Sequence, residues 1–491
     1  METAERRARY QVTFIVLATG VIAYALLQSL VTPVLPTIQA ALHTSQANVT
    51  WVLTAYLLSA SVFTPIVGRL GDMSGKKRVF VWTLVALAVG SLLAAVATSL
   101  TMMIIARVIQ GIGGGVIPLA FGIIRDEFPD EKVPGAVGVI AALIAVGSGL
   151  GIVLAGPIVD ALNYHWLFWL PLIMVVIAAV CAYLFVPESL VRTKGRINYV
   201  AAVLMSTWLV ALLVAVSEAP EWGWGSVRVV GLIALSVVVA IVWILVEVRS
   251  SNPLIDMRMM RIRAVWSTNL VALLFGMGMY SSFAFLPEFF QTPPSAGYGF
   301  GASITESGLM LLPLSVTMFM LGLVAGRMAE AWGSKNVLIV GSIVAVVAFL
   351  MYALQHEHKW DMYLASAILG VGFGMAFAAM SNLIVAAVPP EQTGVASGMN
   401  ANIRTIGGSL GAAFMASVVT SGVAPGTLPA ESGYTNGFLL MTVALVLSVV
   451  AAFFIPAIRR NAKDHREPHV DLRHPELAVV AGGTVVGDES E

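Results

Sequence analysis

The chain carries fourteen runs of about twenty predominantly apolar residues, and this feature restricts its fold more than any other. A helix of about twenty apolar residues spans the hydrocarbon core of a bilayer. Of the 491 residues, 58% are hydrophobic and 11% are charged, whereas about 25% are charged in soluble proteins. The short alternating segments of a membrane β-barrel are missing from the sequence. We therefore predict an all-α membrane protein with spans centred near Tyr24, Leu58, Ala88, Gly113, Gly147, Val176, Trp208, Val239, Met277, Pro313, Ala345, Gly374, Gly407 and Val446.

The positive charges between the spans predict the orientation. An even number of spans places both termini on one side, and the opposite side holds only Arg228 and Lys359. Because loops rich in Lys and Arg stay in the cytoplasm, both termini are predicted to be cytoplasmic. The excess of Arg over Lys, with plentiful Ala, Val and Gly, favours a GC-rich bacterium and thus the bacterial cytoplasmic membrane. The basic side includes Arg6, Arg7, Arg9, Arg192, Lys194, Arg196, Arg249, Arg258, Arg261, Arg263, Arg459, Arg460 and Lys463.

A polar loop occurs twice in the chain, at 68–77 and, roughly 260 residues later, at 326–335. Both copies read Gly-Arg, with an acid at the fifth position, Gly at the eighth and Lys at the tenth. A similar shift aligns the Gly-rich segments 111–115 with 370–374 and 147–151 with 407–411, and Gly138 with Gly398. Runs one to six therefore correspond to runs nine to fourteen, and runs seven and eight are an insertion. Two related halves in a membrane protein favour a transporter with a central site.

The repeat predicts five regions. These are a cytoplasmic tail at 1–11, a six-helix bundle at 12–190, an inserted two-helix hairpin with its flanking cytoplasmic loops at 191–263, a second six-helix bundle at 264–458, and a disordered cytoplasmic tail at 459–491. The last segment is polar and offers no packing surface of its own. The protein is expected to be a monomer in the bilayer.

Three segments resemble motifs of the major facilitator superfamily: the loop at 68–78, the stretch from Arg107 to Gly111, and the Gly-rich stretch 147–157. The two additional central spans resemble its fourteen-helix drug:proton antiporter branch. The resemblance implies a major facilitator fold, with export of lipophilic drugs in exchange for protons, and a role in antibiotic resistance. The chain departs from the branch where Gln28 and its neighbours, before Leu35-Pro36, include no acid. It also departs where Gly151-Ile152 replaces the usual Gly-Pro.

The repeated loops are predicted to latch the cytoplasmic ends of the helices. Gly68 and Gly71 are expected to let the second and third helices approach closely and turn sharply. Asp72 is expected to accept hydrogen bonds from a helix N-terminus or to pair with Arg78. In the second copy, Glu330 would act in the same way. Solvated loop charges are the alternative, and the remaining signature positions are Gly75, Gly326 and Gly333.

Proton coupling needs a titratable group, yet no Asp or Glu lies near the midplane of any run. Glu288 follows Pro287, and a helix bent there would turn the carboxylate into the cavity. Charges inside membrane spans are rare and usually functional, so intramembrane Arg107 joins the candidates through its place in the fourth-run motif. The alternative is that the acids lie at the interface and that the arginine is held by backbone carbonyls. The coupling candidates are Glu288, Glu306, Asp126 and Arg107.

The substrate site is predicted between the halves, near the midplane. Met and aromatic side chains provide an adaptable apolar wall, and a few amides orient the ligand. Ordinary helix packing is the alternative for each position, and for Arg404 a structural role and a substrate contact are equally plausible. The cavity candidates are Tyr24, Gln28, Tyr280, Phe283, Phe377, Asn382, Asn400, Asn402 and Arg404, with Met279 beside them.

Other functions find little support in the sequence. His356 and His358 lack a third metal ligand at useful spacing, so neither a metal site nor a cofactor is expected. Cys181 is read as an apolar filler. No run carries a catalytic constellation, no loop binds ATP in the P-loop manner, and nothing indicates a nucleic-acid partner. A lipid or anionic-metabolite exporter of the same fold, and a membrane receptor or scaffold without transport, stay open as alternatives.

Overall fold

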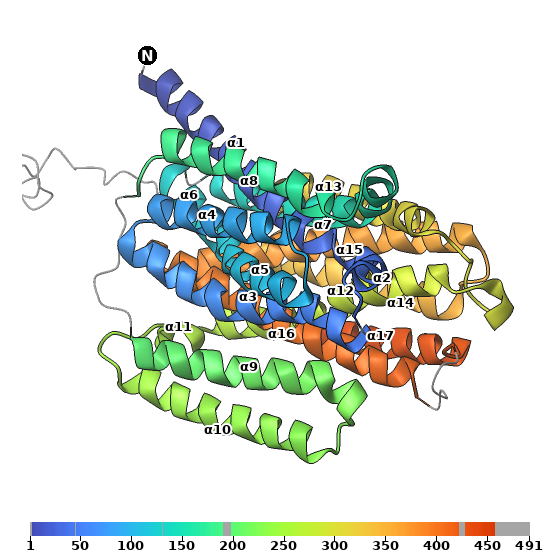
Figure 1. Ribbon diagram of the computed structural model, residues 1–491. Coiled ribbons are helices and arrows are strands. Elements are labelled where there is room, and N and C mark those ends of the chain that lie inside the picture. Colours follow the sequence, from blue (N-terminus) through green and yellow to red (C-terminus); the bar gives the residue numbers. More distant parts are fainter. Residues whose placement is uncertain (1, 45, 130, 190–197, 422–427, 457–491) are drawn as a thin grey trace, which may run out of the picture. The chain divides into compact units, whose positions relative to one another are not determined.

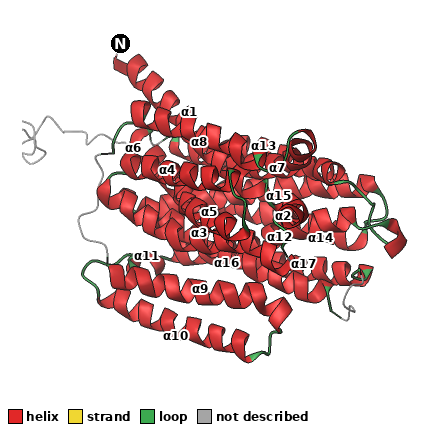
Figure 2. Cartoon of the chain, viewed as in Figure 1, coloured by secondary structure: helices red, strands yellow, loops and turns green. Residues whose placement is uncertain are grey.

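The structure is a computed structural model that describes residues 2–44, 46–129, 131–189, 198–421 and 428–456. Several residues used above to predict orientation lie outside this part of the chain, as does the tail at 459–491. They are Arg192, Lys194, Arg196, Arg459, Arg460 and Lys463, together with the side chains of Arg6, Arg7 and Arg9. The described residues form helices and loops, with no strand among them (Figure 2).

The first half contains α1 (Glu2–Ser29), α3 (Gln46–Ser74), α4 (Lys76–Ala95), α5 (Leu100–Gly111), α6 (Val116–Glu127), α7 (Val133–Ala161) and α8 (Trp166–Phe185). The short elements η1 (Thr32–Val34) and α2 (Leu35–Ala41) follow α1, and η2 (Ile112–Gly115) joins α5 to α6 as one span. The second half contains α12 (Arg263–Gln291), η3 (Pro294–Ala296), α13 (Ile304–Trp332), α14 (Ser334–Leu354), α15 (Lys359–Ala387), η4 (Pro390–Gln392), α16 (Thr393–Val419) and α17 (Glu431–Phe453). Between the halves lie α9 (Tyr199–Trp222), α10 (Val227–Arg249) and the single turn α11 (Met257–Met260).

Within the described residues, 13 spans are long and apolar enough to cross a membrane. The fourteenth predicted span is α16, a helix of 27 residues that is not among these 13. It carries Asn400, Asn402 and Arg404 among many Gly, Ser and Thr residues, which lower its hydropathy. All three of these side chains are buried inside the protein. A polar helix at membrane depth is tolerated where its polar side chains face other helices or a cavity.

The two halves repeat the same helix packing (Figure 1). In the first half α1 packs against α7 and α8, and in the second α12 packs against α16 and α17. The α3–α5, α4–α5 and α4–α8 contacts correspond to α13–α15, α14–α15 and α14–α17. The halves meet chiefly through α3 against α16 and α7 against α13. The helix contacts of the first half therefore recur in the second half.

Glycine allows the abrupt turn in each repeated loop. Gly75, between α3 and α4, has φ = 106°, and Gly333, between α13 and α14, has φ = 81°. Residues with a Cβ rarely adopt this region, so both positions favour glycine. The expectation that Gly68 and Gly71 make the turn is wrong, because both lie inside α3. Their role is close packing, since a Cβ on Gly71 would lie 2.1 Å from the side chain of Leu119 in α6.

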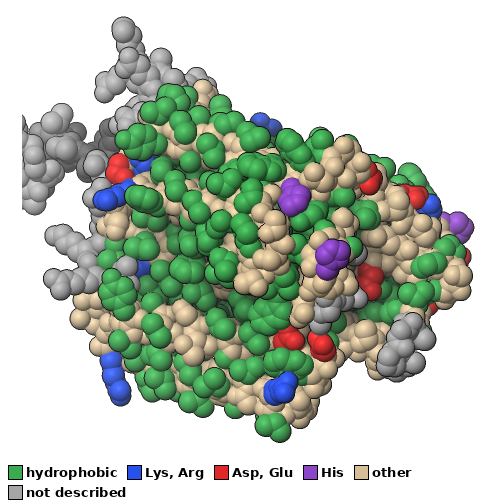
Figure 3. Space-filling model, viewed as in Figure 1, with side chains coloured by type: hydrophobic (Ala, Val, Ile, Leu, Met, Phe, Trp, Pro, Cys, Tyr) green, Lys and Arg blue, Asp and Glu red, His purple; other side chains and the backbone are tan. Residues whose placement is uncertain are grey.

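The inserted helices α9 and α10 pack against each other, and α9 also contacts α3 and α16. In Figure 1 this hairpin runs along the lower edge, next to α16. Only 17% of the apolar stretch of α10 is buried inside the protein, as expected of a helix that faces lipid. Hydrophobic side chains cover the middle of the face in Figure 3, and charged side chains lie mostly toward its two ends. The hairpin thus lies against the junction of the two bundles.

Candidate functional site

A cavity of about 410 Å³ lies between the two bundles. Helices α1, α3 and α7 line it from the first half, and α12 and α16 line it from the second. Its volume is within the range of about 300–1,000 Å³ that is usual for small-molecule sites. The lining reaches Leu53 near the start of α3 and Ala416 near the end of α16, and it includes the exposed residue Ala284 of α12. The cavity therefore extends from the interior toward one end of the bundles.

Most of the side chains predicted for the cavity line it, among amides, aromatic rings and a guanidinium. They are Tyr24, Gln28, Tyr280, Phe283, Phe377, Asn402 and Arg404, and Met279 lies beside them in the wall. The residues from α1 and α3 face those from α12 and α16 across the space. The surface of the wall is mostly apolar, and it also includes several Ser and Thr hydroxyls, such as those of Thr64 and Ser148.

Asn382 and Asn400 do not line the cavity, so these two site predictions are wrong. Asn400 lies on the side of α16 that faces α12, and its Nδ2 donates to Oδ1 of Asn269 at 2.9 Å. Asn382 is buried in α15. In a helix, neighbouring residues point in directions about 100° apart, so a rotation of the helix decides which amide meets the cavity.

The described lining of the cavity includes Arg107 and Arg404 but no Asp or Glu. Arg107 is almost fully buried, and its guanidinium carbon lies 4.2 Å from the ring centre of Tyr56. Its Nε donates to the Val52 carbonyl at 2.9 Å, and its Nη1 donates to Oε1 of Gln110 at 2.9 Å. Arg107 is thus both a cavity residue and a cross-link between α3 and α5. The sequence has no acid near Gln28 in the first span, and the described lining of the cavity accordingly holds no carboxylate from that span.

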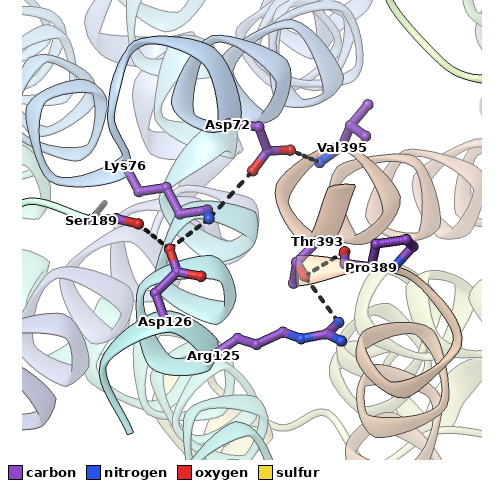
Figure 4. Close-up of polar contacts among 8 residues, drawn as sticks. All are labelled: Asp72, Lys76, Arg125, Asp126, Ser189, Pro389, Thr393 and Val395. Atoms are coloured by element: carbon purple, nitrogen blue, oxygen red, sulfur yellow. Dashed lines mark hydrogen bonds and ion pairs between the residues drawn. The ribbon is translucent and has the colours of Figure 1, made fainter. Parts of the chain in front are cut away.

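Figure 4 shows a cluster of polar contacts near the end of α3 and the start of α16. These helix ends are opposite to the ends at which Leu53 and Ala416 line the cavity. We call this set the gate cluster; it comprises Asp72, Lys76, Arg125, Asp126, Ser189, Thr393 and Val395. The side chains of Asp72 and Lys76 are fully buried. Nζ of Lys76 lies 2.6 Å from Oδ2 of Asp126 and 3.8 Å from Oδ1 of Asp72. One buried ammonium thus sits between two carboxylates, and the Ser189 hydroxyl also donates to Asp126.

Asp72 connects the two bundles. The backbone N–H of Val395, in the first turn of α16, donates to Oδ2 of Asp72 at 3.0 Å. A carboxylate at a helix N-terminus is favourable, because the free N–H groups and the helix dipole both attract it. The structure therefore takes the first of the two predicted alternatives. The other, a pair with Arg78, is wrong: Arg78 is exposed, its backbone N–H donates to Glu188 at 3.3 Å, and Lys76 is the cation beside Asp72.

Arg125 makes a second link between the bundles, and nothing in the repeated loops predicted it. From the last turn of α6 its Nη1 donates to the Val385 carbonyl at the end of α15 and to the Thr393 hydroxyl of α16, the latter at 3.0 Å. Thr393 Oγ1 also lies 3.4 Å from the Pro389 carbonyl. The usable sequence signal was Arg125-Asp126, two charges at the end of an apolar run.

Glu330 does not repeat the role of Asp72, which corrects the expectation of two equivalent latches. It is exposed and makes no hydrogen bond or ion pair with any residue that the structure describes. The partners were not duplicated, since Ser334 stands at the position of Lys76 and the stretch 384–386 is Ile-Val-Ala near the position of Arg125-Asp126. The feature that both copies share is a glycine in close contact with the backbone of the other half. A Cβ on Gly68 would lie 2.7 Å from the Gly394 oxygen. A Cβ on Gly326 would lie 2.8 Å from the Gly135 Cα.

None of the acidic coupling candidates lines the cavity. Glu306 is partly exposed at the start of α13, and its Oε1 lies 2.5 Å from Nζ of Lys359. Asp126 belongs to the gate cluster. Glu288 lies in the last turn of α12 outside the cavity wall, so the expectation that Pro287 turns it inward is wrong. Of these three acids, only Glu288 has no ion pair with a described residue.

The loop histidines do not form a metal site within the described part of the chain. Nε2 of His356 lies 2.7 Å from Oε1 of Glu431, and its Nδ1 lies 3.0 Å from the Tyr352 carbonyl oxygen. His358 pairs instead with Asp361 at the start of α15. The contacts of His356 connect α14 to α17, and the contact of His358 stabilises the start of α15. Both histidines therefore have a structural role.

The inserted hairpin contributes to the cavity, which the sequence did not indicate. Ser217 and Pro220 of α9 line it. Trp224 lies in the turn directly after α9, and its Nε1 donates to the Ser417 hydroxyl of α16 at 2.7 Å. The rings of Trp224 and Phe414 lie 5.1 Å apart between centres. The end of α9 is therefore fastened to α16 beside the cavity mouth.

Replacing Trp224 with leucine is expected to lower the free energy of unfolding by about 1–3 kcal/mol. One buried hydrogen bond contributes about 0.5–1.5 kcal/mol and one aromatic pair a similar amount. Thermal unfolding in detergent measures the change, and hydrogen exchange should quicken in the last turn of α9. Trp222→Leu is the control, because Trp222 stacks on Arg228 within the hairpin at 5.6 Å. Equal effects of the two variants would contradict the fastening role of Trp224.

Comparison with known proteins agrees with this architecture. The model of the Major Facilitator Superfamily matches residues 17–412 and 300–481. The chain is 30% identical over 380 residues to the multidrug transporter protein MdtP of Bacillus subtilis, covering 76% of this chain and 68% of that protein. It is 27% identical over 421 residues to the tetracenomycin C resistance and export protein of Streptomyces glaucescens, covering 85% and 77%.

A solved structure shares the fold. The crystal structure of the human organic anion transporter MFSD10 superimposes with a TM-score of 0.66 at 18% identity, covering 91% of this chain and 99% of that one. The duplicated helix packing, the central cavity and the family match over most of the chain lead to one assignment. This chain belongs to the major facilitator superfamily and has its membrane-transporter fold.

Proposed function

We propose that the protein exports lipophilic small molecules from the cytoplasm by alternating access, in exchange for protons. The observation that carries the proposal is a mostly apolar cavity between two equivalent bundles, closed at one end by buried polar contacts. Such a space suits apolar ligands of varied shape, because Met and aromatic side chains adapt to them. The relatives named as multidrug and tetracenomycin C exporters support the same class of cargo.

The orientation supports export in a particular state. In this proposal the gate cluster and both repeated loops face the cytoplasm of a bacterial cell and the protein lies in the cytoplasmic membrane, which the Lys and Arg bias of the loops supports. The cavity mouth then faces outward, so the structure corresponds to a state closed toward the cytoplasm. Opening the α3–α16 and α7–α13 contacts, while the mouth closes, would expose the same cavity to the cytoplasm.

Proton coupling is the finer part of the proposal. Because the described lining of the cavity holds no carboxylate, we propose that the coupling acid acts from outside the cavity. Glu288 is the strongest candidate: it follows Pro287 in a Pro-interrupted helix and has no ion pair with a described residue. Asp126 would act differently, since loss of its charge would remove the partner of Lys76 and loosen the gate cluster.

The test is transport by the purified protein in liposomes with an imposed pH gradient. Anionic, neutral and cationic lipophilic probes are offered, and uptake is compared with and without the gradient. We expect gradient-dependent movement of at least one probe and loss of that dependence in Glu288→Gln. Glu357→Gln is the matched control, because Glu357 is an exposed acid in a loop at the same end.

Two results would overturn the proposal in different ways. Absence of probe movement across all gradients, from correctly folded protein, would favour a receptor or scaffold. Movement that ignores the proton gradient would keep the exporter and remove proton exchange. If Glu288→Gln stays fully coupled, Glu288 is not the coupling acid.

A further inference from the structure

Arg404 is a buried cation in the cavity wall, and no described residue forms an ion pair with it. It lies in α16 and is only 7% exposed. Its guanidinium carbon lies 4.3 Å from the ring centre of Phe377. It makes no hydrogen bond or ion pair with any described residue, and its Nε is fully buried. A guanidinium has five N–H donors, so most of its hydrogen-bonding capacity is unused by the protein.

Arg107 provides the comparison within the same cavity. Its Nε and Nη1 donate to Val52 and Gln110, so the protein itself holds that guanidinium in place. Arg404 has no such fixing, although both side chains line the same space. The difference points to a group outside the chain as the partner of Arg404.

Asn402 supplies an independent observation. It also lines the cavity, is only 2% exposed, and neither its Nδ2 nor its Oδ1 has a partner within the described structure. A buried amide without partners costs about 1–3 kcal/mol, so native structures rarely contain one that serves no purpose. Asn402 therefore adds a second buried polar side chain of α16 beside the cavity whose hydrogen-bonding capacity is unused within the described structure.

The charges around the cavity favour one sign of ligand. Its described lining holds two arginines and no acid, and the titratable neighbours of Arg404 are the phenols of Tyr24 and Tyr280. A buried charge without a counter-charge is costly in a medium of low dielectric constant. An anionic group would offset that cost and receive paired hydrogen bonds from the planar guanidinium.

We propose that the substrate is an amphipathic organic anion, whose carboxylate, sulfonate or phosphate group binds Arg404. The apolar body packs against Phe283, Met279 and Tyr280, which line the same cavity. This proposal rests on the proposed export function and names the chemical class of its cargo. Both a free amphipathic acid and an anionic lipid carry the required chemistry.

The experiment compares three probes with one apolar body and different head groups: naphthylacetate, naphthylmethanol and naphthylmethyl-trimethylammonium. Binding to the full-length protein is measured by calorimetry in nanodiscs of phosphatidylcholine. We expect naphthylacetate to bind at least about tenfold more tightly than the neutral and cationic probes, because a hydrogen bond to a charged group contributes about 1.5–3 kcal/mol. Repeating the titration with phosphatidylglycerol added tests the source, since competition by the lipid would indicate a lipid head group.

Arg404→Gln should remove the preference for naphthylacetate and change the affinity for naphthylmethanol by less than about twofold. Arg404→Lys should keep part of the preference, because it keeps the charge and loses the planar pair of donors. Arg228→Gln is the control for general attraction, since Arg228 is an exposed cation at the same end.

A wild-type protein that binds the cationic or neutral probe at least as tightly as the anion would overturn this inference, and that result does not depend on the folding of any variant. Retention of the anion preference in a folded Arg404→Gln protein would do the same. The proposed function is tested by a different result. Gradient-driven transport of neutral or cationic probes would support export even if the protein shows no preference for anions.

Discussion

Replacing Lys76 with methionine is expected to lower the free energy of unfolding by about 3–5 kcal/mol and to abolish most transport. Lys76 is fully buried between Asp72 and Asp126, at 3.8 Å and 2.6 Å. Without it, two carboxylates stay buried with no cation between them. Removal of one partner from a buried ionic group leaves an uncompensated charge, which costs more than the intact group contributes.

Thermal unfolding in detergent, with transport in liposomes, measures this loss. Lys77→Met is the matched control, because Lys77 is the next residue and is only partly buried, 5.8 Å above the ring of Tyr183. The double variant Lys76→Met with Asp126→Asn should regain part of the lost stability, since one uncompensated charge is removed. If Lys76→Met were as stable as Lys77→Met, the gate cluster would not contribute to folding as its contacts indicate.

Gly68→Ala is expected to open the gate end of the bundles and to slow transport at least about tenfold. A Cβ at this position would lie 2.7 Å from the backbone oxygen of Gly394, and no side-chain rotation relieves that contact. Overpacking of this kind costs about 1–3 kcal/mol, which shifts a two-state equilibrium by about 5- to 150-fold. The separation of α3 from α16 would also stretch the bond between Asp72 and Val395.

Maleimide labelling of Val395→Cys, in a Cys181→Ala background, reports this opening. Val395 is buried beside Asp72, so labelling should be slow in the parent and fast with Gly68→Ala. Gly135→Ala is the control, because a Cβ there meets nothing within 4 Å. Slow labelling of both variants, with normal transport, would show that the Gly68 contact does not hold the gate closed.

The fold followed from the sequence because its signals are local or repeated. Apolar run length sets the spans, and the recurrence of Gly75 as Gly333 marks equivalent turns that both need positive φ. Those features need no knowledge of how the helices pack. The inserted position of the hairpin followed from the repeat in the same way.

The site was predicted less completely, because it depends on helix rotation and on tertiary partners. Asn400 and Asn402 are two residues apart, yet only Asn402 meets the cavity. Asp72 and Lys76 are four residues apart, a spacing that would have allowed their ion pair to be predicted. Because the chain turns at Gly75, the sequence did not distinguish Lys76 from Arg78 as the partner of Asp72. The contacts of Arg125, and the place of Ser217 in the wall, join segments far apart in the chain, and no local pattern indicates them.

The central claim is that the gate end and the cavity mouth open in alternation, and distances between spin labels test it most directly. One pair would join Ser74 and Pro390 at the gate end, and a second would join Leu162 and Glu357 at the other, all exposed and all in a Cys181→Ala background. Without substrate or proton gradient, the account predicts one short gate-end distance. A transported substrate with a change of pH should lengthen that distance and shorten the second. Distances that both stay fixed, or that change in the same direction, would contradict alternating access by these two ends.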